Sequence, residues 1–312
     1  MQQHDTHHDH EHADGHDHHG HDHPPAVTAG NAKKIRLVFI FTTFYAVIQA
    51  VGGWLAGSLA LIADSGHMIS DSAALLLALI AYQIAARAPD GRRTYGYHRV
   101  RVLAALANGA TLLLLVAWIV WEAIARLREP VEVLAGPMLI VAIIGLLINI
   151  AGALILNSGN KGDSNLRGAL LHVMGDLLGS VGAIAAAIGI MFTGWTVLDP
   201  ILSVVVALLV VRSAWRLISD SIQVLLQATP SGIDADQAQA ELKALPGIAD
   251  AGHFHAWTLT DDASVATVHV TPAPGADSLT LPAVVGGFLR ERYGLSHVTV
   301  QVDPPGSLER HS

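Results

Sequence analysis

Two short motifs each combine a histidine and an aspartate four residues apart, inside apolar segments of the sequence. The first contains His67 and Asp71, and the second contains His172 and Asp176. On an α-helix, residues four apart lie on one face, so each motif presents an imidazole nitrogen beside a carboxylate oxygen. Two such helices that meet would place two nitrogens and two oxygens around one point, which suits tetrahedral coordination of Zn²⁺.

Ionisable side chains in the middle of a membrane helix are unfavourable, which makes these motifs informative. Each such group costs about 2.5–3.5 kcal/mol on insertion, so these residues are rare, face the protein interior and usually serve a function. The alternative interpretation is a pair of hydrogen bonds between His and Asp that join two helices without a metal. The presence of the motif on two separate segments favours a metal or proton site.

The composition is that of an integral membrane protein. Of the 312 residues, 52% are hydrophobic and only 14% are charged, which is atypical of a soluble domain. The absence of cysteine excludes disulfides and thiolate metal sites. Nothing in the charge distribution resembles a surface for nucleic acid. The first residues lack a basic start followed by an apolar core, so we expect no signal peptide.

Residues 1–32 form a low-complexity tail that holds ten of the eighteen histidines, interleaved with Asp and Glu. With almost no apolar residues this tail cannot pack a core, and we expect it to be disordered. Histidine-rich segments bind several transition metals with modest selectivity. An affinity tag is the alternative, but Asp and Gly interrupt the run. The composition therefore favours metal capture or buffering.

Six apolar segments follow, and together they predict a transmembrane domain over residues 33–227. About 20 helical residues are needed to cross the hydrocarbon of a bilayer. The segments cover residues 35–57, 58–87, 102–125, 136–157, 166–193 and 196–217. The first motif lies in the second segment and the second motif lies in the fifth.

The distribution of Lys and Arg predicts the orientation in the membrane. Basic residues gather before the first segment, between the second and third, between the fourth and fifth, and at the end of the sixth. The opposite side carries only Arg126 and Arg128. The positive-inside rule therefore predicts a multi-pass membrane protein with both termini in the cytoplasm.

From about residue 228 the sequence takes on the character of a small soluble domain. An amphipathic helix is expected at 233–245, before Pro246-Gly247. Two alternating strands at 253–260 and 264–271 flank an Asp261-Asp262 turn, and a helix at 281–293 and a strand at 297–302 follow. This order predicts an α+β domain over residues 228–306, which is too small to be an enzyme by itself and suits regulation or dimerisation.

Motifs in four places, in this order, resemble those of the cation diffusion facilitator family, and the bacterial zinc exporters within it. The resemblance extends from about residue 33 to residue 303. The residues that carry it are 57–67 (GSLALIADSGH) with Asp71, Tyr95-Gly96-Tyr97, Leu170-Leu171-His172 with Asp176, and Asp199-Pro200-Ile201.

The resemblance implies a fold class and a function. The fold would be a membrane all-α domain of six transmembrane helices plus a small C-terminal cytoplasmic α+β domain of the ferredoxin-like type, assembled as a homodimer. The protein would not be an enzyme and would need no cofactor. It would exchange cytosolic Zn²⁺ for H⁺ by alternating access, with the ion held by His67, Asp71, His172 and Asp176. In the family, histidine at the position of His67 accompanies a preference for Zn²⁺ over Cd²⁺.

The sequence also departs from the family in two places. Where the family often has Glu after the Tyr-Gly-Tyr motif, this chain has Arg99 and Arg101. No second metal site is therefore expected in that connection, and we interpret His98 as a solvated residue. In the C-terminal domain a partial match to metal-binding positions of some relatives leaves a structural or regulatory zinc site open, because Gly252 occupies one such position. The candidate ligands there are His253, His255, His269 and Asp303.

The chemistry of the four-residue site is compatible with exchange of metal for protons. Two carboxylates and two neutral imidazoles balance the charge of Zn²⁺, and protons compete with the metal for the same lone pairs. Asp64 lies on the same helical face as His67 and Asp71. It could orient His67 or relay protons, or it could form a hydrogen bond to a neighbouring helix.

Three other functions are compatible with parts of the sequence but less with the whole. An intramembrane metalloenzyme is disfavoured because there is no His-Glu-x-x-His motif and no spare acid to serve as a base. A metal sensor would not need ligands in mid-membrane, and a channel would hold the ion too tightly at such a site.

We interpret Gln49, Asn108 and Asn149 as interhelical hydrogen-bonding residues. Asp199 is expected at the membrane interface, or else on a path for protons.

Overall fold

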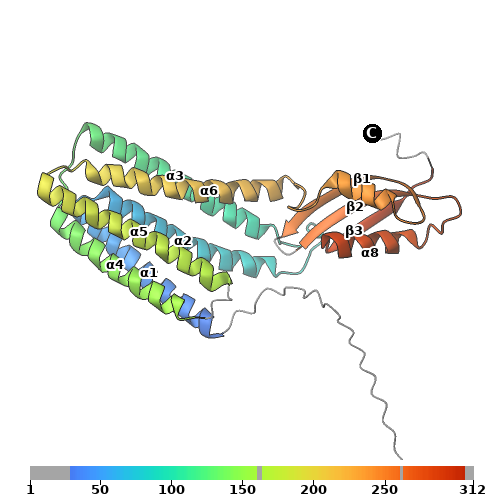
Figure 1. The fold of residues 1–312 in the computed structure, drawn as a ribbon, viewed down its shortest axis with the longest axis horizontal. Helices are drawn as coiled ribbons and strands as arrows, with labels where there is room; N and C mark the ends of the chain where they lie inside the picture. The colour runs from blue at the N-terminus through green and yellow to red at the C-terminus, as the bar shows by residue number, and fades with distance from the viewer. Residues whose placement is uncertain (1–28, 160–163, 261–262, 306–312) are drawn as a thin grey trace, which may run out of the picture.

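The computed structural model describes residues 29–159, 164–260 and 263–305. A bundle of six long helices forms one part of the molecule, and a small sheet with two helices forms the other (Figure 1). All six helices are long and apolar enough to cross a membrane, which confirms the expected number of spans. They are α1 (Ala29–Ala56), α2 (Leu59–Ala85), α3 (Val100–Arg128), α4 (Ala135–Asn157), α5 (Ser164–Thr193) and α6 (Leu198–Leu225).

The bundle is apolar outside as well as inside, as a protein surrounded by lipid must be. Large hydrophobic side chains such as Phe44, Trp54, Trp121 and Leu154 point outward and are mostly exposed. Because lipid tails compete equally for apolar surface, membrane helices associate through close packing of small residues. Gly145 shows this, since an added Cβ there would lie 2.9 Å from the ring of Tyr45 on a neighbouring helix.

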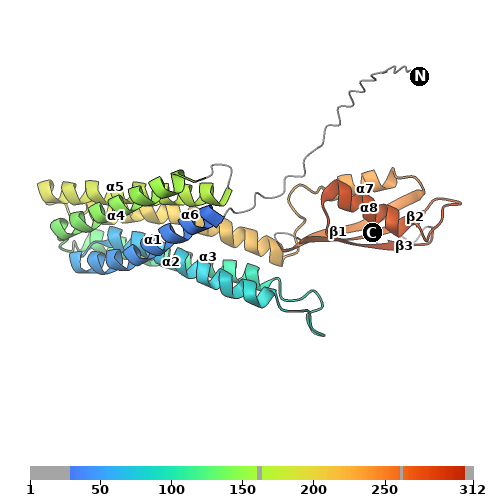
Figure 2. The same cartoon turned by 90° about the horizontal axis from the view of Figure 1, so that it is seen from below.

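The two motif helices have different surroundings. Helix α2 packs against α1, α3 and α6, whereas α5 packs mainly against α4. Helices α2 and α5 contact each other directly over only a short stretch. The view in Figure 2 shows the bundle and the small sheet at opposite ends of the molecule. The motifs therefore face each other where two parts of the bundle meet.

Two helix ends differ from the sequence expectation. Helix α1 begins at Ala29, inside the range expected for the tail. Further along α1, Lys34 Nζ donates to the backbone oxygen of Ser158 at the end of α4. The histidines of the tail lie in residues 1–28, outside the described residues. Helix α6 continues past residue 217 to Leu225, so the expected end was wrong. Apolar character marks the hydrocarbon of the bilayer, whereas the helix itself extends beyond it.

The small C-terminal part has the expected α-β-β-α-β order. Strands β1 and β2 pair antiparallel, β3 pairs parallel with β2, and the strand order is β1-β2-β3. The expected turn at residues 261–262 lies outside the described residues. The elements are α7 (Ala235–Lys243), β1 (Ile248–Thr260), β2 (Ala263–Pro272), α8 (Leu281–Tyr293) and β3 (His297–Val302).

Both short helices cover one face of this sheet (Figure 2). Val268 and Val270 of β2 are fully buried with Val285 and Leu289 of α8 in the core beneath them. Because strand side chains alternate between faces, His269 points away from this core. The face of the sheet away from the helices therefore carries His269 together with other side chains outside this core, such as Trp257.

Candidate metal site

The start of helix α2 fixes the position of the first motif. Ser58 is the N-cap, and its hydroxyl accepts a hydrogen bond from the backbone N–H of Leu61. Such a cap satisfies an amide that the helix leaves unpaired. Gly57, before it, has φ of 70°, a conformation that favours glycine. The turn and the cap define where α2 begins, so His67 and Asp71 follow after a fixed number of turns.

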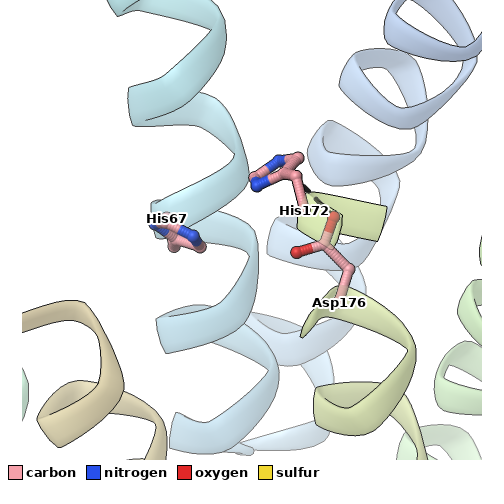
Figure 3. A group of neighbouring side chains, drawn as sticks. All are labelled: His67, His172 and Asp176. Atoms are coloured by element: carbon pink, nitrogen blue, oxygen red, sulfur yellow. Dashed lines mark ion pairs between the residues drawn. The ribbon is translucent and has the colours of Figure 1, made fainter. Parts of the chain in front are cut away.

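The structure brings all four predicted ligands together. Nε2 of His67 lies 3.5 Å from Oδ2 of Asp71 within α2. From α5, Nε2 of His172 lies 3.5 Å from the same oxygen and 3.7 Å from Oδ2 of Asp176. Figure 3 shows His67 of α2 facing His172 and Asp176 of α5. The pairing of His with Asp within each helix follows from the four-residue spacing.

These separations are close to those that a tetrahedral zinc site requires. With metal–ligand bonds of about 2.0–2.2 Å, ligand atoms in a tetrahedron lie roughly 3.3–3.6 Å apart. The potential ligand atoms of His67, His172 and Asp176 all lie within 4.8 Å of one another. Asp71 contacts both histidines. Small side-chain shifts would therefore bring two nitrogens and two oxygens around a single ion.

Two atoms of this group lack a hydrogen bond within the part of the chain that the structure describes. They are Nδ1 of His67 and Oδ2 of Asp176, and both atoms are buried. A buried polar atom without a hydrogen bond is destabilising, and native structures contain few of them. A cation bound by Asp176 would compensate this carboxylate oxygen. The site therefore has the chemistry of a metal site.

A small cavity of about 80 Å³ borders the candidate site. Asp71, His172 and Asp176 line it, together with residues of α1 and α4 and with Ala169 near the start of α5. The side chain of His172 is 46% exposed, whereas that of Asp176 is only 5% exposed. Of the four side chains, that of His172 is thus the most exposed.

Asp64 lies deeper in the bundle, and its hydrogen bond goes to a neighbouring helix. Nε2 of Gln49 in α1 donates to Oδ2 of Asp64 across 2.6 Å. His67 Nδ1 has no hydrogen-bond partner among the described residues, so this conformation contains no bond by which Asp64 orients His67. Gln49 is therefore the direct partner of Asp64, which the sequence alone did not identify.

The other two intramembrane amides also join helices. Nδ2 of Asn149 in α4 donates to the hydroxyl of Ser180 in α5 at 3.2 Å. The hydroxyl of Ser70 in α2 donates to Oδ1 of Asn108 in α3 at 3.4 Å. These contacts match the interhelical role expected from the sequence.

Asp199 has a role that sequence reasoning missed. This carboxylate is fully buried and accepts hydrogen bonds from the Ser58 hydroxyl at 2.6 Å and from the backbone N–H groups of Leu59, at 2.6 Å, and Ala60, at 3.2 Å. The guanidinium of Arg126 in α3 lies 3.7 Å from it. Asp199 therefore links the start of α6 to the first turn of α2 and to α3. The Asp199-Pro200-Ile201 motif marked this residue in the sequence, but its partners follow only from the tertiary structure.

In the small sheet, three of the four candidate ligands lie near one another. Nδ1 of His269 lies 2.8 Å from Oδ2 of Asp303, and the rings of His253 and His269 have centroids 5.1 Å apart. His255 is exposed on β1. The hydrogen bond from Gln301, followed by the effect of His269, holds the pKa of Asp303 below its usual range. A metal site here stays a prediction.

Comparison with known proteins defines the family. The family model described as "Cation efflux transmembrane domain" matches residues 35–226, which include all four predicted ligands. The chain therefore belongs to the cation efflux family, as its resemblance to the cation diffusion facilitators indicated. It is a multi-pass membrane protein, and the family consists of transporters, not enzymes.

Several named bacterial proteins are similar to this chain over most of its length. The zinc transporter ZitB of Yersinia pestis is 46% identical over 275 residues, covering 88% of each chain. ZitB of Escherichia coli (strain K12) is 43% identical over 275 residues with the same coverage. The cadmium, cobalt and zinc/H(+)-K(+) antiporter of Bacillus subtilis (strain 168) is 41% identical over 293 residues, covering 91% of this chain and 92% of that protein.

Proposed function

We propose that this protein exports Zn²⁺ from the cytoplasm in exchange for H⁺ by alternating access. The observation that carries the proposal is the group of two imidazoles and two carboxylates at which α2 and α5 meet. Their nitrogen–oxygen separations of 3.5–3.7 Å are close to those of a tetrahedral zinc complex. The names of the ZitB relatives and of the Bacillus antiporter agree with a metal cargo and with proton exchange.

The ligand set supports both the choice of metal and its release. Imidazole and carboxylate ligands suit Zn²⁺ and neighbouring divalent transition metals, whereas Mg²⁺ prefers oxygen ligands alone. His67 and His172 bind metal only when neutral, and Asp71 and Asp176 only when ionised. Protons that reach these four side chains therefore displace the metal, and metal that arrives displaces protons. This competition couples the two fluxes.

The proposed orientation places both termini in the cytoplasm, at the inner membrane. The cavity beside His172 reaches Ile35 of α1 and Ala169 of α5. These residues lie near Lys33, Lys34 and Arg167, at the end of the bundle that the positive-inside rule assigns to the cytoplasm. At the other end, the network around Asp199 holds α2, α3 and α6 together. This arrangement supports a state in which the site is reached from the cytoplasm.

The remaining parts are proposed to serve this transport. The tail of residues 1–32 would capture metal, and the domain of residues 228–306 would stabilise a homodimer and hold regulatory zinc at His253, His269 and Asp303, with His255 as a further candidate. Asp64, which lies one helical turn before His67 on α2, would relay protons to the site. Zinc is then a transported substrate, and the protein needs no cofactor.

Zinc uptake by proteoliposomes tests the transport proposal. The native protein is reconstituted, an acidic interior is imposed, and zinc uptake is followed with a trapped fluorescent indicator. We expect uptake that stops when a proton ionophore collapses the gradient, with alkalinisation of the interior during uptake. Uptake that is indifferent to the gradient would contradict proton exchange. Tight zinc binding without any flux would favour a sensor.

A further inference from the structure

A cavity of about 410 Å³ lies where the α2–α3 connection meets the C-terminal part of the chain. Residues 92–100 and Leu103 form one side of it, and Gln227, Trp257 and Leu259 form the other. This volume falls in the range of sites for small ligands. Nothing in the transport proposal uses this cavity, which lies far along the molecule from the motif residues.

The cavity carries a cluster of arginines within a largely apolar and aromatic lining. Arg92, Arg93 and Arg99 line it, and no residue that lines it in the described part of the chain is acidic. The Nε atom of Arg99 is buried and has no hydrogen-bond partner among the described residues. A guanidinium presents a planar fork of donors that matches a phosphate or carboxylate. The cavity is therefore suited to an anion.

The connection that carries these arginines has a fixed conformation. Oδ1 of Asp90 accepts hydrogen bonds from the backbone N–H groups of Arg92 and Arg93 at 2.8 and 2.7 Å. Its other oxygen accepts from the hydroxyl of Tyr97 at 2.6 Å. Asp90 also pairs with the guanidinium of Arg93. Arg92 and Arg99 thus remain as the two cations of the cavity without an ion pair among the described residues.

The position of the cavity identifies the kind of anion. Helices α2 and α3 are long and apolar enough to cross a membrane, so the connection between them lies outside the hydrocarbon, on the side of the lipid headgroups. Tyr95 and Trp257 line the cavity with the arginines, and such aromatic side chains favour the membrane–water interface. Leu103, at the side nearest the hydrocarbon, is 52% exposed. The headgroup of a lipid would contact the arginines and the aromatic side chains, and its first acyl carbons would contact Leu103.

We propose that this cavity binds the phosphate group of an anionic phospholipid, with Arg92 and Arg99 as the recognising side chains. A lipid there would bridge the membrane bundle and Trp257 of the C-terminal part. The proposal does not depend on which ion is transported or on which leaflet faces the cavity. It uses the general attraction of basic membrane-proximal segments to acidic lipids, here concentrated in a bounded cavity.

Lipid retention measured by native mass spectrometry tests this site. The full-length protein in detergent is titrated separately with phosphatidylglycerol, phosphatidylcholine and inorganic phosphate. We expect native protein to bind phosphatidylglycerol roughly tenfold more tightly than phosphatidylcholine, because both lipids carry the phosphate but choline adds a cation beside it that the two arginines repel. The combined variant Arg92→Gln/Arg99→Gln should lose this preference. The exposed Arg216→Gln is the matched control and should keep it.

Three outcomes would overturn the proposal. Equal retention of both lipids by native protein would remove the anionic specificity. Displacement of phosphatidylglycerol by millimolar inorganic phosphate would show that the cavity takes free phosphate. A variant that keeps its lipid but loses subunit association would identify the cavity as a contact between copies. If Arg99→Gln fails to fold, Arg99→Lys keeps the charge and should retain lipid with intermediate affinity.

Discussion

Nε2 of His172 in α5 lies 3.5 Å from Oδ2 of Asp71 in α2, across an interface that little other packing supports. The two helices contact each other over only a short stretch, while each packs extensively against other neighbours. An ion bound between these side chains would hold α2 and α5 together, and its loss would remove that link. Metal occupancy and helix arrangement are therefore coupled in this account.

The first prediction concerns the close approach of α5 to Asp64. A Cβ added at Gly179 would lie 3.1 Å from Oδ1 of Asp64, whose other oxygen is held by Gln49. We expect Gly179→Ala to be less stable than Gly168→Ala by about 1–3 kcal/mol, the usual effect of overpacking. Gly168 is the matched control because nothing lies within 4 Å of its added Cβ. Detergent-induced unfolding in mixed micelles measures the difference, and equal stability of the two variants would contradict this packing.

The second prediction concerns the buried cap formed by Asp199. Asp199→Ala leaves Arg126 without this partner and exposes unpaired amides at the start of α2. We expect a loss of about 1–3 kcal/mol, the usual effect of leaving buried hydrogen-bonding groups unpaired, because Arg126 keeps its ion pair with Glu122. The same unfolding assay measures this loss. Asp199→Asn should lose less because its amide oxygen can still cap the helix. The exposed Glu129→Ala should change stability by less than about 0.5 kcal/mol. An Asp199→Ala protein as stable as this control would exclude a structural role for the cap.

The third prediction concerns the pH dependence of the C-terminal part. Hydrogen bonds from Arg292, Gln237 and Tyr293 lower the pKa of Glu241 from 4.5 to about 2. Because the folded-state pKa is the lower one, Glu241 stabilises the fold above about pH 4.5, and this contribution is lost as the pH falls toward 2. We expect hydrogen-exchange protection of α7 and α8, corrected for intrinsic rates, to fall over that interval.

Two variants separate Glu241 from other acids in this test. Glu241→Gln should show weaker protection at neutral pH and a smaller change on acidification. Glu291→Gln, an exposed position on α8, should follow the native protein at every pH. If Glu241→Gln keeps the full native pH dependence, another acidic residue is responsible.

The spans and the paired motifs could be predicted because membrane insertion imposes strong local rules. Twenty apolar residues identify a span wherever they occur, and a spacing of four fixes His and Asp on one helical face. The meeting of His172 with Asp71 was expected because the motif occurs twice and because the family resemblance implies a site shared by the two helices. Which helices surround α2 and α5 depends on packing that no local rule encodes.

The hydrogen-bond partners of the buried acids could not be predicted for the same reason. Gln49 and Asp64 lie on consecutive helices, yet their contact requires the register of α1 against α2. Asp199 is far in sequence from Ser58, and only the tertiary structure places it at the start of α2. Helix α6 extends beyond its apolar segment because the later part of the helix packs against α3 through contacts such as that of Ile218 with Gly109.

The most direct test of the central claim is zinc flux into proteoliposomes that carry single alanine variants of the four motif residues. Each variant is reconstituted beside the native protein and Glu129→Ala, after its unfolding midpoint has been checked. Flux is the chosen readout because zinc held by the histidine-rich tail does not cross the membrane. The residues to be substituted are His67, Asp71, His172 and Asp176.

The account predicts that each substitution lowers gradient-driven flux by more than roughly 100-fold, since removal of a direct ligand should exceed the 10–100-fold effect of a supporting residue. Glu129→Ala should transport zinc at the native rate. Native-like flux in folded Asp71→Ala and His172→Ala proteins would contradict the claim that these helices hold the ion between them.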